Sequence, residues 1–443
     1  MTAQAPKVML LPFAYPDYPP DLVERFIRES EDFLRGLGLQ VQRVPAVAVA
    51  DDVPAAIAAL RSQEYDLIVA TLISWVEAPL FTAALRPVWG KPLLLWSHTT
   101  FVEGDTRFTI GALPAAGVIR ETLEEMGARF TFTWGMPGEE RVRRDVVRQA
   151  RAAAAANALS QAKVGLFGYA SMGMYTGTID HTQLRAQIGP EIEQLDQYLI
   201  IERFEHISDA NVRDLLPRSR EWLLGDKVQD ADILRSLRFY AAIKALAREH
   251  RLDALTVKCQ YELSRVFGLA PCVPLSILGD EMVTSCEGDV PLVVSQLILH
   301  CLTGGVTSYG DLHHVDGNKV LWGSCGYAPL SCAAGRPVIN KHTALYEGLL
   351  NSSPFRAGTV TLARLSPKGR GFKLHIASGE AIAPPSFREV GCPAYPLIQV
   401  VQRGDIEHFM QNLGSQHYAI VYGDVTQDLL ALSALLGVEA IVS

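Results

Sequence analysis

The sequence lacks the features that mark several large classes of protein. Its seven cysteines form no CxxC pair, which argues against a zinc ribbon or a thioredoxin-type redox site. No stretch reaches the roughly 18 apolar residues that a membrane-spanning helix needs, and the N-terminus lacks a signal-peptide pattern. The 40 basic and 48 acidic residues give a net charge of −8, a poor basis for gripping nucleic acid. We therefore expect a cytoplasmic protein with reduced, mostly buried thiols and neither a nucleic-acid nor a membrane partner.

Short apolar runs alternate with amphipathic stretches through the first two thirds of the chain. In the first block the apolar runs are at 8–12, 65–70, 92–96 and 130–132. A second block opens with the run at 163–167, and its helical patterns lie at 181–187, 230–250 and 290–303, with Gly304 as the stop of the last. Strands separated by helices are typical of a parallel sheet that is covered on both faces.

The amino-acid composition changes after about residue 305, where glycine and β-branched residues become more frequent. Strands are predicted at 358–365, 372–378 and 417–423. We therefore predict an α/β fold of two doubly wound parallel-sheet domains, followed by a β-rich, barrel-like C-terminal domain. The predicted domains are 1–160, 161–304 and 305–443, the central one carrying part of the functional site.

A glycine-rich segment, KVGLFGYASMGMYTG, begins at Lys163. It matches neither GxGxxG nor GxxxxGK[ST], so a nucleotide-binding loop has little support and a tight strand-to-helix turn is the favoured interpretation. A turn at the carboxyl end of a parallel strand can still line a crevice for a small molecule. We therefore expect Met174 and Tyr175 to contact a substrate.

The residues able to carry chemistry are densest between Lys258 and Pro329, with one later histidine. A hard divalent cation prefers carboxylate oxygens and accepts an imidazole, and the available donors are Glu287, Asp289, Asp311, His313, His314 and His417. Composition alone does not choose among them. Glu287 and Asp289 could simply be acids at a helix start, and the two adjacent histidines could belong to a solvated turn before the hairpin signal Asp-Gly.

The order of motifs resembles the L-fucose and L-arabinose isomerase superfamily, and is closest to its shorter fucose-isomerase-like members. The motifs are Lys258-Cys259, LGDEMVTSCEGDV, a strand ending in Gly310-Asp311, CGYAP and GSQHYAIVYGD, with WSHTT and TIGAL fitting in the first domain. The chain departs from the pattern at Gly310, where arabinose isomerases have glutamate. It departs again at Ser324, where many relatives place a histidine.

The resemblance implies a metal-dependent aldose–ketose isomerase that works through an enediol. It assigns Glu287, Asp311 and His417 as metal ligands, with Glu287 and Asp311 also serving as the catalytic acid/base pair. Such an oxygen-rich set with one nitrogen suits Mn²⁺, with Mg²⁺ or Co²⁺ as substitutes. The ion would polarise the sugar carbonyl while the carboxylates move the proton between C1 and C2.

Further expectations concern the sugar and the assembly. Lys258 and Gln260 are expected to orient sugar hydroxyls, although Lys258 could equally be a structural ion-pair partner. The resemblance also implies a homo-oligomer, a hexamer or a trimer-based assembly, in which Trp96 and His98 complete a neighbour's pocket. A histidine that only caps the sheet edge is an equal alternative for His98.

Two other classes of function remain open from the sequence. The chain could be a sugar-binding protein that has lost its chemistry, or a metal-dependent lyase or aldolase on the same scaffold. Two acids and a histidine on one ion favour an enzyme, because a binding protein has no need of them.

Overall fold

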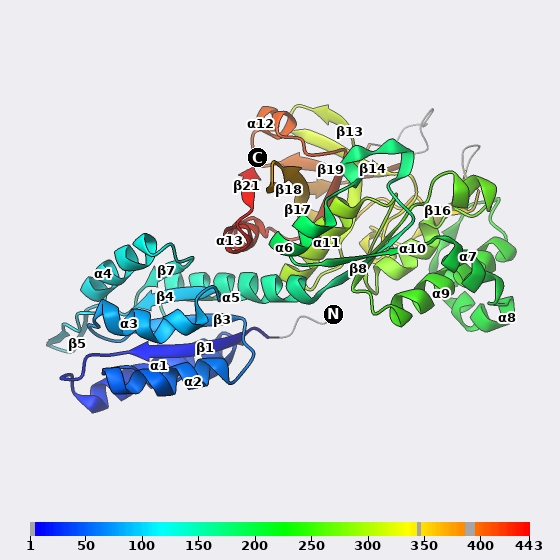
Figure 1. Ribbon diagram of the computed structural model, residues 1–443. Coiled ribbons are helices and arrows are strands. Elements are labelled where there is room, and N and C mark those ends of the chain that lie inside the picture. The colour runs from blue at the N-terminus through cyan, green and yellow to red at the C-terminus, as the bar shows by residue number, and fades with distance from the viewer. Residues whose placement is uncertain (1–4, 343–346, 386–394) are drawn as a thin grey trace. The chain divides into compact units, whose positions relative to one another are not determined.

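The computed structural model describes residues 5–342, 347–385 and 395–443 (Figure 1). They form two compact units that meet in the sequence at Asn157 and Ala158. Both the central and the C-terminal predicted domains lie within the second unit, and the division into three domains stays a prediction. Within the described ranges, no helix is both long and apolar enough to cross a membrane.

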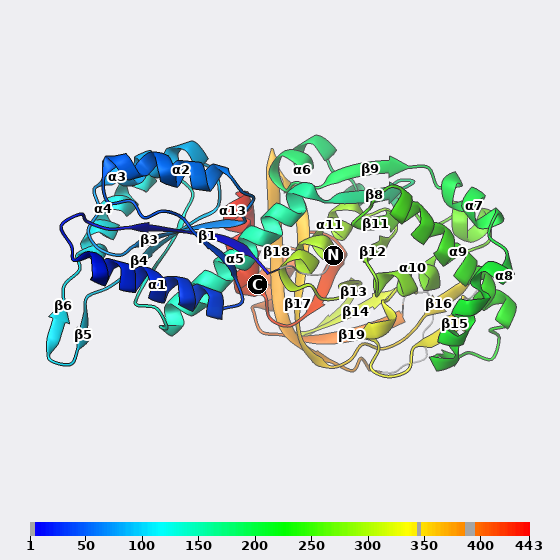
Figure 2. The same ribbon diagram turned by 90° about the horizontal axis from the view of Figure 1, so that it is seen from below.

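The first unit is a five-stranded parallel sheet in the order β2-β1-β3-β4-β7. Its strands are β1 (Lys7–Phe13), β2 (Gln40–Arg43), β3 (Leu67–Leu72), β4 (Leu93–Ser97) and β7 (Thr131–Trp134). Its helices are α1 (Pro20–Gly36), α2 (Val53–Arg61), α3 (Ala78–Leu85), α4 (Ala112–Glu125) and the first part of α5 (Glu140–Gln161). Figure 2 shows α2, α3 and α4 on one face of this sheet and α1 and α5 on the other. A small hairpin, β5 (Phe101–Glu103) with β6 (Thr106–Phe108), stands apart from the sheet.

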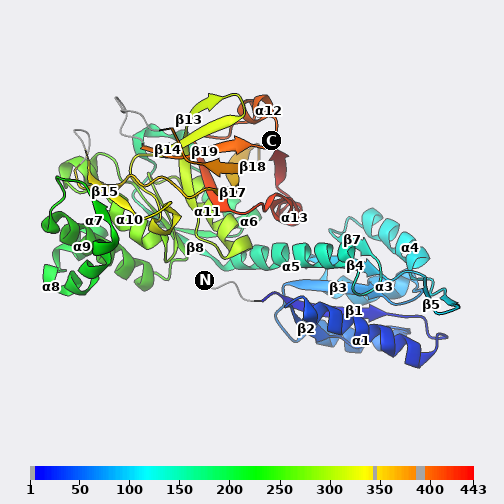
Figure 3. The ribbon, with the colours of Figure 1, turned by 180° about the vertical axis from the view of Figure 1, so that it is seen from behind.

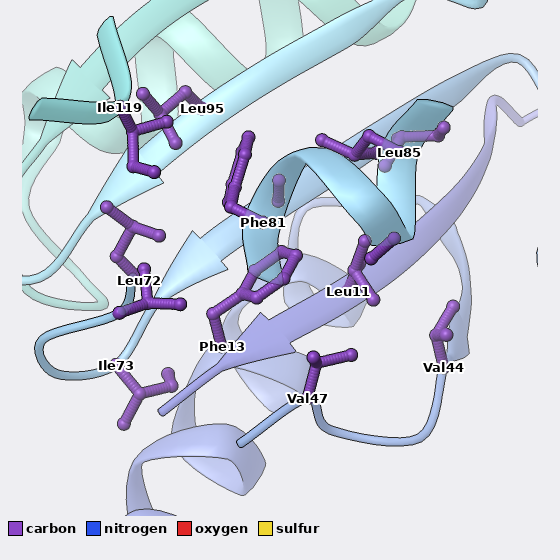
Figure 4. Packing of buried hydrophobic residues seen from close by; sticks show 14 of the residues in the cluster. Leu11, Phe13, Val44, Val47, Leu72, Ile73, Phe81, Leu85, Leu95 and Ile119 are labelled. Carbon is purple, nitrogen blue, oxygen red and sulfur yellow. The ribbon is translucent and has the colours of Figure 1, made fainter. Parts of the chain in front are cut away.

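The core of this unit explains why its strands are continuous apolar runs. Every residue of β3 is buried, because helices cover both faces of a parallel sheet. In Figure 4, Phe13 of β1 and Phe81 of α3 meet between sheet and helix, with ring centroids 4.6 Å apart. Leu11 and Leu72 pack in the same cluster. Strands of alternating polarity would not fit this position.

Trp96 and His98 are both buried inside the first unit. The Trp96 indole donates a hydrogen bond to the Gly135 carbonyl at 2.9 Å, and His98 Nε2 is 2.9 Å from the Ser30 hydroxyl. Within one chain, these contacts suit structural roles at the end of β4. A role in a neighbour's pocket stays a prediction.

The burial of His98 leads to a prediction about acid stability. Burial lowers the pKa of His98 from 6.5 to about 3, so the folded chain keeps this imidazole neutral while the unfolded chain takes up a proton below about pH 6.5. Stability from this group is therefore full above pH 6.5 and falls on acidification, by about 1.4 kcal/mol per pH unit between roughly pH 6 and 4. Urea unfolding of wild type and His98→Gln at several pH values should show a shallower dependence in the variant. His206→Gln, which changes an exposed histidine, should follow wild type, and equal slopes in all three proteins would contradict this account.

The second unit contains a four-stranded parallel sheet in the order β12-β11-β8-β9. Its strands are β8 (Lys163–Phe167), β9 (Glu191–Leu195), β11 (Ala254–Val257) and β12 (Val283–Cys286). Its helices are α6 (His181–Gln187), α7 (Tyr198–Glu205), α8 (Asp209–Val212), α9 (Asp230–Glu249), α10 (Cys272–Gly279) and α11 (Val290–Thr303). The chain runs from β8 outward to β9 and then returns to β11 on the other side of β8. The order therefore reverses between β8 and β11, where sheets of this kind bind ligands at the carboxyl ends of their strands.

A closed six-stranded barrel follows in the same unit, in the order β17-β20-β13-β14-β19-β18, with β17 pairing with β18 to close it (Figure 3). Its strands are β13 (Ser308–Asp316), β14 (Lys319–Ser324), β17 (Gly358–Lys368), β18 (Gly371–Ile382), β19 (Tyr395–Gln402) and β20 (His417–Tyr422). β21 (Glu439–Val442) pairs with β18 at the outside of the barrel, and the helices of this region are α12 (Ile406–Gln411) and α13 (Thr426–Leu436). A separate small sheet consists of β10 (Leu223–Leu224), β15 (Val338–Lys341) and β16 (Leu349–Asn351). The predicted α/β class, with parallel-sheet domains and a barrel-like C-terminal region, is confirmed.

Two local predictions have different outcomes. Gly304 ends α11 in the left-handed conformation, with φ of 65°, as the sequence predicts. The glycine-rich segment after β8 instead forms two short 3-10 turns, Ser171–Gly173 and Tyr175–Gly177, before α6 begins at His181. The connection between β8 and α6 is therefore longer than the tight turn that the sequence favours, and its residues lie beside the start of α11.

Candidate active site

The carboxyl ends of two neighbouring parallel strands supply the first part of the site. Lys258 and Gln260 follow β11, and Glu287 follows β12. The Gln260 amide donates to Glu287 Oε1 at 3.3 Å. These side chains therefore gather at the edge of the sheet where the order of the strands reverses.

Glu287 is held in an unusual backbone conformation. Its φ is 68° and that of Gly288 is 66°, a region that costs a non-glycine residue roughly 1–2 kcal/mol. A Cβ on Gly288 would lie 2.2 Å from the Tyr169 carbonyl oxygen, so this position needs glycine. The Glu287 carbonyl accepts a hydrogen bond from the Ser171 amide at 2.7 Å, which fixes the turn to the segment after β8. Strain of this kind is concentrated at functional sites.

The barrel supplies the second part. His417 begins β20 and pairs in register with Asp311 on the antiparallel strand β13. His417 Nε2 lies 2.9 Å from Asp311 Oδ1 and 3.5 Å from Glu287 Oε2. The three residues predicted as ligands are thus brought together from positions far apart in the sequence, around one imidazole nitrogen.

A buried ion pair sets the orientation of that imidazole. Asp289 caps α11 by accepting from the Leu292 amide, and its Oδ2 lies 2.8 Å from His417 Nδ1. The same carboxylate oxygen accepts from Arg364 of β17 at 2.9 Å, and both side chains of this pair are almost fully buried. Because Nδ1 donates to Asp289, Nε2 faces Glu287 and Asp311, and in the neutral imidazole it directs its lone pair toward them.

His417 Nε2 is buried and has no hydrogen-bond partner. Oxygens of both carboxylates lie within 3.5 Å of this nitrogen, but neither is aligned with it as in a hydrogen bond. The nitrogen is therefore close to two acids and still lacks a hydrogen-bond partner. A histidine whose second nitrogen is fixed by a carboxylate, with its first nitrogen facing acidic oxygens, is the usual form of a metal ligand. The donor set therefore fits a divalent cation.

The charges at the site shift the pKa values in opposite directions. Burial favours neutral imidazole, but Asp311, Asp289 and Glu287 together outweigh it and raise the pKa of His417 well above its ordinary value. Burial raises the pKa of Glu287 well above the usual range, and the nearby Cys325 adds to this effect. Burial would also raise the pKa of Asp289, but Arg364 and His417 hold it at about 2. Three carboxyl groups but one guanidinium surround His417, so a cation that replaces a proton there would be stabilised.

The remaining predicted residues lie in several environments. Lys258 is buried, pairs with Glu262 and lies 2.9 Å from the Tyr169 hydroxyl. Met174 accepts a contact from Gln416, next to His417, at 2.7 Å, whereas Tyr175 is 91% exposed. His313 and His314 are exposed on β13 and are not gathered with the other donors.

Sequence reasoning undervalued two residues of this site. Asp289 was interpreted as a helix-start acid, and it is one, but the same carboxylate also orients His417. Arg364 was not singled out at all. The available signal was an arginine in the apolar run GTVTLARL, because a charge at a buried strand position requires a buried partner.

No family model matches the chain. The curated sulfoquinovose isomerases of Priestia aryabhattai and Priestia megaterium (strain ATCC 12872 / QMB1551) are each 23% identical over 444 residues, covering 98% of both chains. The sulfoquinovose isomerase of Alkalicoccus urumqiensis is 24% identical over 447 residues, again 98% of both chains.

A solved ABC transporter solute binding protein from Agrobacterium vitis, bound with alpha-D-tagatopyranose, covers 68% of this chain and 90% of its own at 13% identity. Its TM-score of 0.17 is too low to indicate a shared fold. The curated relatives, in contrast, match over nearly the full length. They confirm the predicted enzyme class, and the chain is an aldose–ketose isomerase.

Proposed function

We propose that this isomerase converts sulfoquinovose, or a closely similar anionic aldose, to its ketose through an enediol, with a divalent metal ion as cofactor. The sugar is suggested by the names of the curated relatives. The metal is supported by the buried, unpartnered Nε2 of His417 beside two carboxylates. The resemblance to the L-fucose and L-arabinose isomerase superfamily is part of the same proposal.

Glu287, Asp311 and His417 would hold the ion, Mn²⁺ first, with Mg²⁺ or Co²⁺ as substitutes. Two carboxylates and one neutral imidazole balance its charge. When bound, such an ion polarises the sugar carbonyl and stabilises the negative charge that develops on oxygen.

The two carboxylates divide the proton transfers. In the aldose-to-ketose direction the C2–H bond breaks, a C1–H bond forms, and one proton moves from O2 to O1. We assign the carbon-bound proton to Glu287, whose side chain is 4% exposed and whose pKa is raised by burial, which makes it a stronger base than a solvated glutamate. Asp311, whose side chain is 20% exposed, is assigned the transfer between the oxygens.

Lys258 and Gln260 are proposed to orient sugar hydroxyls. The carbonyl oxygen of Gln260 is buried without a hydrogen-bond partner, although its amide nitrogen contacts Glu287. An acceptor in this state is available to a hydroxyl donor. We further propose a homo-oligomer, in which the end of a neighbour's β4 helps to enclose the sugar; Trp96 and His98 are buried there and would position this edge of the sheet.

The test is isomerisation of sulfoquinovose followed by NMR in D₂O, with L-fucose and L-arabinose as comparison sugars. We expect a ketose product that carries solvent deuterium at C1, and deuterium at C2 of the aldose that is re-formed from the enediol. After exhaustive treatment with EDTA the activity should fall to background, and Mn²⁺ should restore it. Without the ion, two negatively charged carboxylates cannot stabilise the negative charge that develops on the sugar oxygen.

Each other outcome contradicts a separate part of the proposal. Full activity after chelation would contradict metal dependence. Release of a shorter carbon fragment would indicate a lyase, whereas sugar binding without exchange or product would indicate a binding protein. Conversion of L-fucose in preference to sulfoquinovose would contradict the assignment of the sugar.

A further inference from the structure

Buried thiols surround the opposite side of the Glu287 carboxylate from His417. Cys325 Sγ lies 3.5 Å from Glu287 Oε1, whereas His417 is near Oε2. The Cys259 and Cys286 thiols contact each other, and Cys325 contacts both Cys286 and Cys272. All four cysteines are free and buried. One carboxylate thus stands between an oxygen–nitrogen donor set and a sulfur donor set.

The sulfur set has the spacing of a metal site. Ligand atoms of Cys259, Cys286 and Glu287 all lie within 4.8 Å of one another. Around a tetrahedral zinc ion, ligand atoms are separated by roughly 3.5–3.8 Å, given Zn–S and Zn–O bonds of about 2.3 and 2.0 Å. Small side-chain movements would therefore close this group on one ion. The unpartnered Gln260 carbonyl oxygen, next to Glu287, is an additional oxygen donor.

We propose that Cys259, Cys286 and Glu287 form a second, inhibitory site for one thiophilic divalent ion, Zn²⁺ or Cd²⁺. On binding, two S–H bonds break, two metal–sulfur bonds form, and the two protons pass to solvent. Thiolate ligands select such ions over Mn²⁺, which prefers oxygen. The two donor sets on either side of Glu287 therefore discriminate between classes of metal.

Inhibition follows because the carboxylate is shared, and this part rests on the proposed function. With one ion held near Oε2 and a second bound through Oε1, neither oxygen of Glu287 is left to accept the carbon-bound proton. Zn²⁺ is thus expected to inhibit the Mn²⁺-loaded enzyme, even with Mn²⁺ in excess. The thiol site itself is independent of whether Mn²⁺ is the native cofactor.

The test uses Cd²⁺ as the probe, because thiolate-to-cadmium charge transfer gives an ultraviolet absorption that oxygen ligands do not give. Full-length wild type is compared with Cys259→Ala/Cys286→Ala and with the matched control Cys301→Ala/Cys332→Ala, which removes two thiols outside the cluster. Wild type and control should titrate to one Cd²⁺ per chain. The cluster variant should bind at least about tenfold more weakly, as expected for the loss of ligands.

The second readout is inhibition by Zn²⁺ of each protein's own Mn²⁺-dependent activity. The inhibitory concentration should rise at least about tenfold in the cluster variant and stay unchanged in the control. If the double variant does not fold, judged by circular dichroism, Cys259→Ser replaces it, because serine keeps the volume and removes the thiolate.

A missing thiolate absorption in wild type, an equal absorption in all three proteins, or its loss only in the control would overturn the proposal. Cadmium binding at the cluster without inhibition by Zn²⁺ would overturn the inhibitory role. If Cd²⁺ binds as expected while the Mn²⁺-loaded protein shows no isomerisation, the proposed function fails and the thiol site stands.

Discussion

Replacing Glu287 with glutamine is expected to lower the turnover number by at least about 10³-fold, because an amide neither accepts the carbon-bound proton nor supplies a charged metal ligand. Folding should survive the change. Glu287 is buried and burial raises its pKa, so neutral glutamine removes a desolvation penalty. The measurement pairs steady-state isomerisation with urea unfolding of the same protein.

The matched control for this experiment is Glu249→Gln, which neutralises a glutamate paired with Arg203 at the surface. Its activity should equal that of wild type. Turnover retained in Glu287→Gln, with intact folding, would remove this carboxylate from the mechanism. A variant that loses both activity and folding would instead show that the residue is needed for structure.

The second large effect is expected from Arg364→Met. Arg364 and Asp289 are 1% and 0% exposed, and removing one partner leaves the other charge buried. Breaking such a pair destabilises a protein by about 3–5 kcal/mol. Arg364 also donates to the Thr176 carbonyl at 2.6 Å, so the turn beside the site loses an attachment. Urea unfolding should show the loss, and under the proposed function the activity that remains should need more Mn²⁺.

Two further variants test whether the buried charge of Asp289 causes this loss of stability. Arg356→Met changes an exposed arginine that contacts Tyr422, and it should lie within about 0.5 kcal/mol of wild type. In Arg364→Met/Asp289→Asn the stranded charge is gone, so this double variant should be more stable than Arg364→Met. A double variant that is less stable would contradict the explanation by a buried carboxylate that has lost its guanidinium partner.

Much of the fold could be predicted from the sequence because periodicity and burial agree. The apolar run at 67–72 becomes a strand buried on both sides, and Gly304 ends α11 where the helical pattern stops. Closure of the barrel could not be predicted, because it depends on pairing between β17 and β18 and between β17 and β20, and strand periodicity does not choose partners.

The site was predictable in its residue types but not in its connections. Motif resemblance singled out Glu287, Asp311 and His417, and the structure brings these side chains together. The role of Asp289 could not be recognised, because a carboxylate at a helix start has a sufficient local reason to be there. The adjoining thiols come from separate segments, and no spacing in the sequence indicates that Cys259 and Cys325 both lie near the Glu287 carboxylate.

The register pairing of His417 with Asp311 also has a consequence for biosynthesis. The imidazole belongs to β20, whose partners β13 and β17 are made earlier, so the proposed ion-holding set is complete only when the last barrel strand arrives. A ribosome-bound or prematurely terminated chain that stops before β20 would carry two acids without their nitrogen partner. Under the proposed function, the chain would therefore capture the metal ion only after β20 has been made, and fragments without β20 would not compete for it.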